Sequence, residues 1–483
     1  MSFYQKLDQR LVQGALGDQL FLPLSTLDEF TKANITAQLP RMTRFFYRGL
    51  ADKVLLHARK IFAILVLMGE QDTIRDILRD GLKDEDLPLS LPENGSAYTL
   101  VSWNRKVFKS FAAWGKEARV KEFLAKQWFV LAPVFERSGQ RIELNTKCAL
   151  PIVNTELIAG VNACMMVAPL LTISKDDEAT VAIKEFRVKA SFDHEEENLL
   201  KVQNLEHNHL IRIIATCDRE PSYYVIFPWA DGGNLREFWQ DEDSHRTPEL
   251  ILWSLRQMLG LADGLKALHT ENCRHGDLKP ENILHFKKSD DPSDESQGNL
   301  VIADVGVSKF HREATKLRNL PTNTKATTPT YEAPEAHPDV KDPRSRVYDT
   351  WSMGCIYLEW VVWLLYGMNA VRRFRQARTS DDPMIEAGSF YIHAPQGTPP
   401  VHPKVSEAFG VLKEDPRCID GTAFGDLLGL IAKDLLVAVD SRATASKLAD
   451  QLGRIVHDAV QRPLYFYKQV DPPPDIPKFF TMP

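Results

Sequence analysis

The chain has 483 residues, enough for two or three domains that each bury a hydrophobic core. Its formal net charge of -6 at pH 7 gives no electrostatic reason to expect binding to nucleic acid. The six cysteines lack short paired spacings, which argues against a zinc site or a disulfide framework. We therefore expect a cytoplasmic protein, and entry into the nucleus stays open as an alternative.

Residues 1–145 are predicted to form a mainly α-helical N-terminal domain. Apolar residues recur with helical spacing across residues 51–81 and again across residues 122–135. The first ten residues lack the cationic stretch and apolar core of a secretory signal. Nothing in this region points to catalysis, and two interpretations stay open: a regulatory domain that binds a partner protein, or an extension that packs on the next domain and stabilises it.

Residues 151–460 are predicted to form a second domain that begins with short strands. Apolar patterns predict strands at residues 181–184 and 223–227, and again at residues 300–303. The acidic run at residues 193–197 suits the first turn of a helix, because negative charge there interacts favourably with the helix dipole.

The apolar run at residues 353–368 is predicted to be a buried helix. It is shorter than the roughly 20 residues needed to cross a bilayer, and it contains Glu359, so no contact with a membrane is expected. The polar segment at residues 287–298 predicts a solvated loop. Residues 461–483 are predicted to form a C-terminal extension, part of it proline-rich.

Residues 275–284, HGDLKPENIL, are the most informative segment of the chain. They place Asp277 five positions before Asn282, with Lys279 between them. Phosphoryl transfer requires a carboxylate that orients the attacking hydroxyl and accepts its proton, a cation that neutralises developing charge, and an oxygen ligand for a metal ion. Asp277, Lys279 and Asn282 can supply these functions in that order. For this segment alone, the alternative is a chance turn that caps a helix.

The segment resembles the catalytic loop of the eukaryotic protein kinase superfamily, and Lys279 is typical of its serine/threonine branch. Further segments are similar to kinase motifs and follow the family's order: VAIK at residues 181–184, DVG at 304–306, APE at 333–335, DTWSMGC at 349–355, and then Arg442. Each motif is weak alone, but their order and spacing argue against coincidence. The resemblance implies an α+β, two-lobed protein kinase fold, with a β-rich small lobe and a helical large lobe, behind the mainly α-helical N-terminal domain.

The resemblance also implies ATP and Mg²⁺ as cofactors. Lys184 corresponds to the lysine that holds the non-transferred phosphates of ATP. Among the glutamates at residues 195–197, Glu195 corresponds best to the partner of that lysine. Asn282 and Asp304 correspond to the magnesium ligands.

Six further residues correspond to positions that contact ATP in the family. One belongs to the glycine-rich loop, two enclose the adenine, one is the gatekeeper and two belong to the hinge. In that order they are Gly160; Val167 and Ala182; Phe227; Pro228 and Ala230. In addition, the family pairs the glutamate of its APE motif, here Glu335, with the late arginine, here Arg442.

Two positions depart from the family's pattern. Residues 160–167 contain only the first of three expected glycines, Gly160, and residues with a Cβ hinder close approach of backbone amides to phosphates. Gly276 stands where many kinases have an arginine that binds a phosphate in the activation loop, so we expect activity without phosphorylation of that loop. Thr328, just before the APE motif, is expected to have a structural role.

The predicted function is ATP-dependent phosphorylation of serine or threonine residues on protein substrates. A pseudokinase scaffold that signals through its N-terminal domain is the alternative. The incomplete glycine-rich loop favours the scaffold, whereas the complete set of residues that contact phosphate and metal favours the enzyme. A small-molecule phosphotransferase fits less well, because such proteins usually lack the APE motif. Glu281 and Glu359 occupy positions that bind a substrate arginine in basic-directed kinases.

Overall fold

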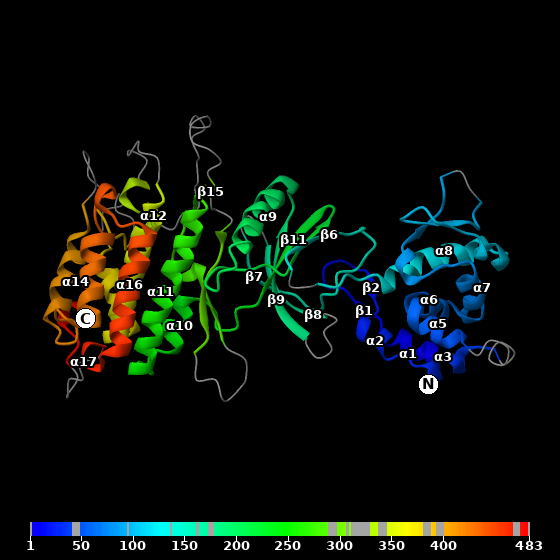
Figure 1. The fold of residues 1–483 in the computed structure, drawn as a ribbon, viewed down its shortest axis with the longest axis horizontal. Coiled ribbons are helices and arrows are strands. Elements are labelled where there is room, and N and C mark those ends of the chain that lie inside the picture. Colours follow the sequence, from blue (N-terminus) through cyan, green and yellow to red (C-terminus); the bar gives the residue numbers. More distant parts are fainter. Residues whose placement is uncertain are drawn as a thin grey trace. The chain divides into compact units, whose positions relative to one another are not determined.

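The computed structural model describes most of the chain and divides it into two compact units (Figure 1). The first unit is Met1–Asp193 with Ile213–Trp229, and the second is His194–Arg212 with Ala230–Pro483. The described residues are 2–40, 49–93, 96–135, 138–160, 164–171, 178–287, 297–305, 309–310, 329–336, 345–379, 388–392, 400–466 and 474–481.

The described residues of the N-terminal part of the first unit form several short α-helices. They are α1 (Phe3–Asp8), α2 (Leu24–Asp28), α3 (Lys32–Gln38), α5 (Leu50–His57), α6 (Arg59–Met68), α7 (Ile74–Arg79) and α8 (Glu117–Lys126). Two small antiparallel sheets accompany them: β1 (Val12–Gln13) with β2 (Leu20–Phe21), and β3 (Leu89–Ser90), β4 (Leu100–Ser102) and β5 (Val107–Phe108). The mainly helical character expected for this region is therefore confirmed.

Helix α6 lies in the core of this N-terminal part. The helix begins with Arg59 and Lys60, and every residue after them is apolar. Because it is apolar on all faces, residues 61–67 are all buried. The helix ends at Gly69, whose φ of +72° is a left-handed conformation that glycine adopts without strain. The buried cluster around α6 runs from Leu7 to Val130, so the N-terminal part has a hydrophobic core of its own.

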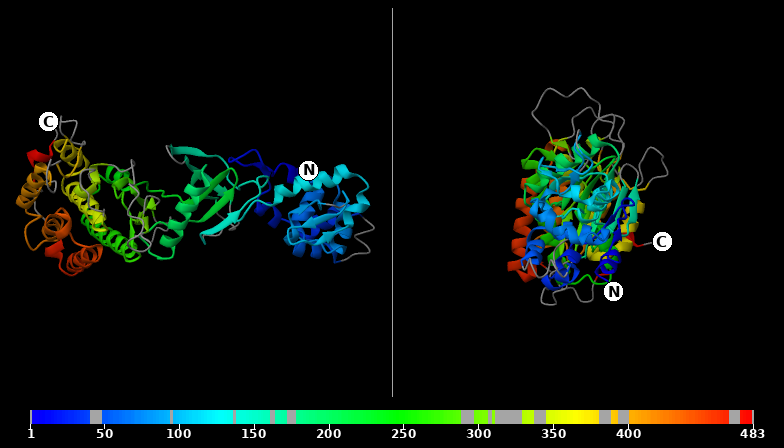
Figure 2. Two further views of the ribbon diagram at one scale, coloured as in Figure 1. Left: turned by 90° about the horizontal axis from the view of Figure 1, so that it is seen from above. Right: turned by 90° about the vertical axis from the view of Figure 1, so that its right-hand side faces the viewer.

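A six-stranded sheet forms the rest of the first unit (Figures 1 and 2). Its spatial order is β6-β10-β11-β9-β8-β7. The strands are β6 (Gln140–Glu143), β7 (Glu156–Gly160), β8 (Cys164–Leu171), β9 (Glu178–Phe186), β10 (Ala215–Arg219) and β11 (Ser222–Pro228). Neighbouring strands are antiparallel except β6, which runs parallel to β10. Strand β6 comes from the region assigned to the N-terminal domain, and it extends the sheet at one edge.

The side chain of Arg219 connects this sheet to the N-terminal segment. Its Nη1 donates to the carbonyl of Leu16 at 3.0 Å, and its Nη2 donates to Gln19 Oε1 at 2.7 Å and to the carbonyl of Thr146 at 2.9 Å. Leu16 also packs against the sheet's own hydrophobic cluster. Residues near the N-terminus therefore contact the sheet directly, through hydrogen bonds and through apolar packing.

The second unit is mainly helical. Its helices are α10 (Leu235–Asp241), α11 (Pro248–Thr270), α12 (Val347–Tyr366), α13 (Met368–Ala377), α14 (Pro403–Glu414), α15 (Ala423–Leu430), α16 (Ala445–Gln461) and α17 (Pro463–Phe466). Most of α9 (Lys189–Gln203) belongs to it as well. Helices α11 and α16 pack side by side (Figures 1 and 2).

Helix α12 is the buried centre of the second unit. Every residue from Tyr348 to Tyr366 is buried, which confirms the buried helix predicted within residues 353–368. The helix ends before Gly367, whose φ is +88°, and α13 begins at Met368. Among the described residues, the structure contains no helix that is both long and apolar enough to span a membrane.

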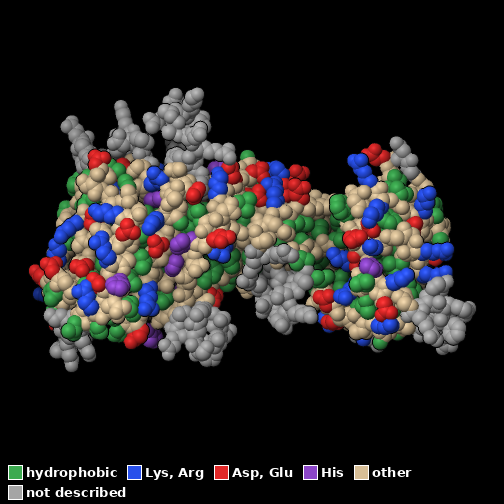
Figure 3. All heavy atoms as spheres, in the orientation of Figure 1, with side chains coloured by type: hydrophobic (Ala, Val, Ile, Leu, Met, Phe, Trp, Pro, Cys, Tyr) green, Lys and Arg blue, Asp and Glu red, His purple; other side chains and the backbone are tan. Residues whose placement is uncertain are grey.

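Two short β-ladders carry the loops of the second unit. Strand β12 (Cys273–Arg274) pairs with β15 (Lys309–Phe310), and β13 (Ile283–Phe286) pairs with β14 (Asn299–Ile302), both antiparallel. The sequence between β12 and β13 contains Asp277, Lys279 and Asn282. On the face of the molecule shown in Figure 3, acidic and basic side chains are interspersed over the helices of this unit.

Candidate active site

The loop at residues 275–282 is anchored to the buried carboxylate of Asp349, near the start of α12. Asp349 Oδ2 accepts hydrogen bonds from the backbone amide of His275 and from His269 Nε2, both at 2.9 Å, and Oδ1 accepts one from the amide of Gly276 at 2.8 Å. Burial raises the pKa of Asp349, but the hydrogen bonds from His269 and the loop amides outweigh it, so the pKa lies below its ordinary value. Gly276 has a φ of +86°, which most other residues adopt only with strain.

The three residues predicted to act in phosphoryl transfer lie together on this loop. Lys279 Nζ donates to Asp277 Oδ2 at 2.8 Å. Asn282 Nδ2 donates both to the backbone carbonyl of Asp277, at 2.8 Å, and to its Oδ2, at 3.1 Å. Residues Pro280–Asn282 form one turn of 3-10 helix, η5, which brings Asn282 back toward Asp277. The carboxylate of Asp277 is thereby held between a cation and an amide.

Asp304 follows β14, and the backbone of the residue before it is hydrogen-bonded to the catalytic loop. Ala303, the residue before it, donates its amide to the carbonyl of Asn282 at 2.9 Å, and the carbonyl of Ala303 is 2.8 Å from His275 Nε2. Asp304 has a φ of +57°, a left-handed conformation that aspartate tolerates better than most residues. The two predicted magnesium ligands, Asn282 and Asp304, thus come from adjoining segments.

The predicted adenine-binding residues of the first unit share one row of the sheet. Val167 on β8 is paired with Ala182 on β9, and Ala182 is paired with Phe227 on β11. Pro228 follows Phe227 and is paired with Val181. The register therefore places Val167 and Ala182, predicted to enclose the adenine, in one row with Phe227, the predicted gatekeeper, although the three are far apart in the sequence.

Lys184 and Gly160 also belong to this sheet. Lys184 lies two residues after Ala182 on β9, opposite Val225, and its Nζ is 5.3 Å from the centre of the Phe186 ring. Gly160 ends β7 and is paired with Cys164. Residues 161–163 of the predicted glycine-rich segment lie outside the described residues, as do Gly306, Thr328 and most of the segment 287–298.

The other two predicted ATP-binding residues, Glu195 and Ala230, belong to the second unit. On α9, Glu195 and Glu196 are buried, whereas Glu197 is exposed and its Oε1 accepts a hydrogen bond from Lys201 at 2.7 Å. The carbonyl of Ala230 accepts a hydrogen bond from the amide of Gly233 at 3.0 Å.

The expected pair between Glu335 and Arg442 is confirmed. Arg442 Nη1 and Nη2 donate to the two carboxylate oxygens of Glu335 at 2.6 and 3.0 Å. Arg442 Nη1 also donates to the carbonyl of Val347, the first residue of α12, at 3.0 Å. This bidentate, buried ion pair fixes the APE motif to α12.

Comparison with known proteins agrees with these motifs. Residues 168–398 match the family described as the protein kinase domain. The chain carries a protein kinase domain. This segment includes the catalytic loop, Lys184, Glu195 and Asp304, while Gly160 and Val167 precede it. The domain belongs to the eukaryotic serine/threonine protein kinase superfamily, and the β-rich sheet with its helical second unit agrees with that fold.

Several curated proteins are similar to the kinase domain. Serine/threonine-protein kinase Sgk1 of Rattus norvegicus is 31% identical over 207 residues, which are 41% of this chain and 42% of that protein. Serine/threonine-protein kinase Sgk1-B of Xenopus laevis shows the same identity and coverage, and Sgk1 of Homo sapiens is 30% identical over the same length and shares. The chain thus spans less than half the length of the curated relatives it matches.

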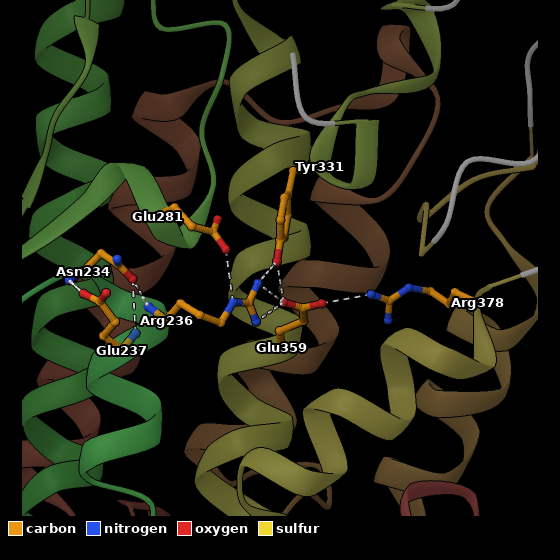
Figure 4. A network of polar contacts seen from close by, with 7 residues as sticks. All are labelled: Asn234, Arg236, Glu237, Glu281, Tyr331, Glu359 and Arg378. Atoms are coloured by element: carbon orange, nitrogen blue, oxygen red, sulfur yellow. Dashed lines mark hydrogen bonds and ion pairs between the residues drawn. The ribbon is translucent and has the colours of Figure 1, made fainter. Parts of the chain in front are cut away.

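A polar network beside the catalytic loop was not predicted. It joins Glu281 and Glu359 to Arg236 and Arg378, together with Tyr331 (Figure 4). The sequence suggested that the two glutamates occupy positions that bind a substrate arginine, but in the structure both are paired with arginines of the chain itself. Arg236 and Arg378 belong to none of the recognised motifs, and more than 100 positions separate them along the chain.

Proposed function

We propose that this kinase domain transfers the γ-phosphoryl group of ATP to serine or threonine hydroxyls of a protein substrate. The cluster of Asp277, Lys279 and Asn282 supports this most strongly. A carboxylate in contact with a cation, next to an amide that can serve as a metal ligand, is the arrangement that phosphoryl transfer to a hydroxyl needs. The similarity to serine/threonine-protein kinases supports the choice of acceptor.

The side chains on the catalytic loop fit magnesium and ATP. Asn282 Nδ2 makes both hydrogen bonds to Asp277, so the amide orientation is fixed by its neighbours and Oδ1 is the atom that can bind a metal. Asp304 supplies a carboxylate from the adjoining segment, and oxygen ligands of this kind are those that Mg²⁺ prefers. Bound Mg²⁺ and ATP would provide the reactive phosphorus and neutralise the phosphate charge.

Each residue of the cluster has a defined role in this proposal. Asp277 accepts a hydrogen bond from the substrate hydroxyl and takes its proton as the oxygen attacks. Lys279, 2.8 Å from Asp277, fixes the carboxylate and offsets negative charge on the transferred group. By resemblance, Lys184 holds the non-transferred phosphates and Glu195 orients Lys184.

A pseudokinase scaffold is the second candidate, because residues 160–167 retain only one of the three expected glycines. Fewer glycines weaken the contact between backbone amides and phosphates. In this alternative the chain would signal through binding, with its N-terminal part as the surface for a regulatory partner. The two candidates differ in whether loss of Asp277 removes a measurable rate.

Two substitutions test the proposed roles against each other. Asp277→Asn should reduce phosphoryl transfer about a hundredfold or more while ATP affinity changes little, because Asp277 faces the hydroxyl rather than the nucleotide. Asp304→Asn should weaken both transfer and Mg²⁺-dependent ATP binding, because it removes a charged metal ligand. The exposed Asp420→Asn, in the same unit, is the matched control.

Rates are measured with labelled ATP, and affinities by titration calorimetry with and without Mg²⁺. Equal loss of ATP affinity in both variants would contradict the separate roles. A wild-type chain that binds ATP but has no rate to lose would favour the scaffold.

A further inference from the structure

Two carboxylates and two guanidinium groups form a set of linked ion pairs beside the catalytic loop (Figure 4). Glu281 lies four residues after Asp277 on the same loop, within η5. Arg236 comes from the first turn of α10, Glu359 from the middle of α12, and Arg378 from the residue after α13. The set therefore ties three helices to the loop that holds the catalytic residues.

Glu359 is the centre of this set, and both of its oxygens are occupied. The side chain is 0% exposed. Its Oε1 accepts a hydrogen bond from Arg378 Nη2 at 2.9 Å, and its Oε2 accepts one from the Tyr331 hydroxyl at 2.7 Å and is 3.3 Å from Arg236 Nη1. Burial raises the pKa of Glu359, but the charges of Arg236 and Arg378 outweigh it and hold the pKa below its ordinary value.

Arg236 lies between the two carboxylates. Its Nε is 3.3 Å from Glu281 Oε1 while its Nη1 reaches Glu359, so one guanidinium contacts both groups. Figure 4 shows the side chain extending from α10 toward Glu359, with Glu281 alongside. The guanidinium also lies 5.3 Å from the ring of Trp239, and it contacts the hydroxyl of Tyr331. These contacts leave the Arg236 side chain only 13% exposed.

Arg378 is held even more firmly on the other side of Glu359. Its guanidinium carbon is 3.8 Å from the centre of the Phe374 ring and 3.9 Å from that of Phe390, and the side chain is fully buried. Its Nε donates to the carbonyl of Gly388 at 3.1 Å. Arg378 is therefore a fixed part of the core, whereas Arg236 is the member that separates Glu359 from the partly exposed Glu281.

We infer that Arg236 is a specificity-determining residue that excludes a basic substrate side chain from the acidic pair Glu281 and Glu359. Two positive and two negative charges cancel within the set. An incoming arginine or lysine would meet the like charge of Arg236 and would have to displace a guanidinium that already contacts both carboxylates. The surface next to Asp277 thus selects protein segments whose residue at this place is neutral or acidic. The inference rests on the proposed kinase function.

Peptide binding tests this inference without requiring catalysis. Each peptide of a fluorescent set contains one serine and one arginine in an otherwise neutral sequence, and the arginine moves by one position from peptide to peptide. Fluorescence anisotropy gives the Kd of each peptide for the whole chain. Mg²⁺ and a non-hydrolysable ATP analogue are present. The wild type should show no position at which arginine strengthens binding. Arg236→Met retains an unbranched side chain and removes the charge. It should strengthen binding about tenfold at one position of the arginine.

Three further variants make the result specific. Arg236→Met combined with Glu281→Gln should lose the new preference, and Arg236→Lys, which keeps a positive charge, should behave as the wild type does. Arg372→Ala, an exposed arginine on α13, is the control and should change nothing. Glu281→Gln alone should leave binding of all arginine peptides within about twofold of wild type, because its carboxylate is already occupied.

Two results would overturn the inference. One is a clear arginine preference in the wild type that Glu281→Gln removes, and the other is a folded Arg236→Met protein that gains no preference. Failure of the proposed function looks different: no phosphate transfer to any peptide, whatever the arginine scan shows. If Arg236→Met does not fold, the wild type and Glu281→Gln are compared instead. An arginine preference that Glu281→Gln removes overturns the inference, and equal binding by both proteins agrees with it.

Discussion

Asp349 shows how one buried carboxylate can organise a catalytic loop. It accepts hydrogen bonds from two consecutive loop amides and from His269, and it is fully buried. Because these partners hold its pKa below the ordinary value, Asp349 stabilises the folded chain at neutral pH. That stabilisation is complete above the pKa of an unfolded aspartate, near 4, and is lost as the pH falls through the lower folded value.

Asp349→Asn should therefore destabilise the second unit by about 3 kcal/mol at neutral pH, since an amide nitrogen would replace an oxygen that faces N–H donors. The variant should also lose less stability than the wild type does on acidification from about pH 7 to about pH 3. Melting curves across that range measure both effects, with Asp420→Asn as the control. Parallel curves for wild type and variant would show that Asp349 does not carry this pH dependence.

At the residue scale, the catalytic cluster could be predicted and the arginine network could not. Asp277, Lys279 and Asn282 lie within six consecutive residues, so their chemistry is visible in the sequence itself. Arg236 meets Glu281 and Glu359 only because α10, η5 and α12 pack together. Arg236 lies on a short helix, where an arginine is usually exposed to solvent. The sequence therefore gives no indication that it pairs with the buried Glu359.

Among the elements, long strands and buried helices were easiest to predict. The strands predicted at residues 181–184 and 223–227 lie within β9 and β11, and three of the four residues predicted at 300–303 lie within β14. These strands could be predicted because their apolar runs are long enough to show a pattern. The short strands β1 to β6 were not predicted, because two to four residues are too few for a period to appear. Their pairing depends on partners elsewhere in the chain.

The helical stretch predicted at residues 51–81 is divided into separate helices. It contains three: α5, α6 and α7. Ala58 separates α5 from α6 with φ -147° and ψ 35°, outside the helical range, and Gly69 ends α6. Local backbone breaks of this kind depend on packing around the buried helix α6, which the apolar pattern alone does not reveal.

The loop between β12 and β13 leads to a prediction about regulation. Gly276 offers no guanidinium for a phosphate on the activation loop, so phosphorylation of Thr327, Thr328 or Thr330 should not be needed for activity. Treatment of the wild-type chain with a phosphatase should leave its rate within about twofold of the untreated protein. A loss that an upstream kinase restores would instead mean that another cation receives the phosphate.

At the scale of the whole molecule, the N-terminal part and the six-stranded sheet belong to one compact unit with two hydrophobic clusters. The boundary at residue 145 stays a prediction, and β6 shows that residues 140–143 pair with β10. The hydrogen bonds from Arg219 to Leu16, Gln19 and Thr146 support the interpretation that the N-terminal segment stabilises the sheet.

Removal of the Arg219 side chain tests this stabilising role. Arg219→Ala should lower the free energy of unfolding of the first unit by about 2 kcal/mol, because three acceptors lose a charged donor. The exposed Arg79→Ala, in the same unit, is the matched control. Chemical denaturation followed by circular dichroism measures the change. Identical midpoints for Arg219→Ala and the control would mean that these contacts contribute nothing to stability.

Transfer of the γ-phosphoryl group by the whole wild-type chain is the most direct test of the central claim. The chain is incubated with Mg²⁺, γ-labelled ATP and a mixed library of serine- and threonine-containing peptides, and the phosphorylated residues are identified by mass spectrometry. Our account predicts phosphoserine or phosphothreonine that depends on Mg²⁺ and disappears with Asp277→Asn. A wild-type chain that binds ATP but phosphorylates neither itself nor any peptide would contradict it.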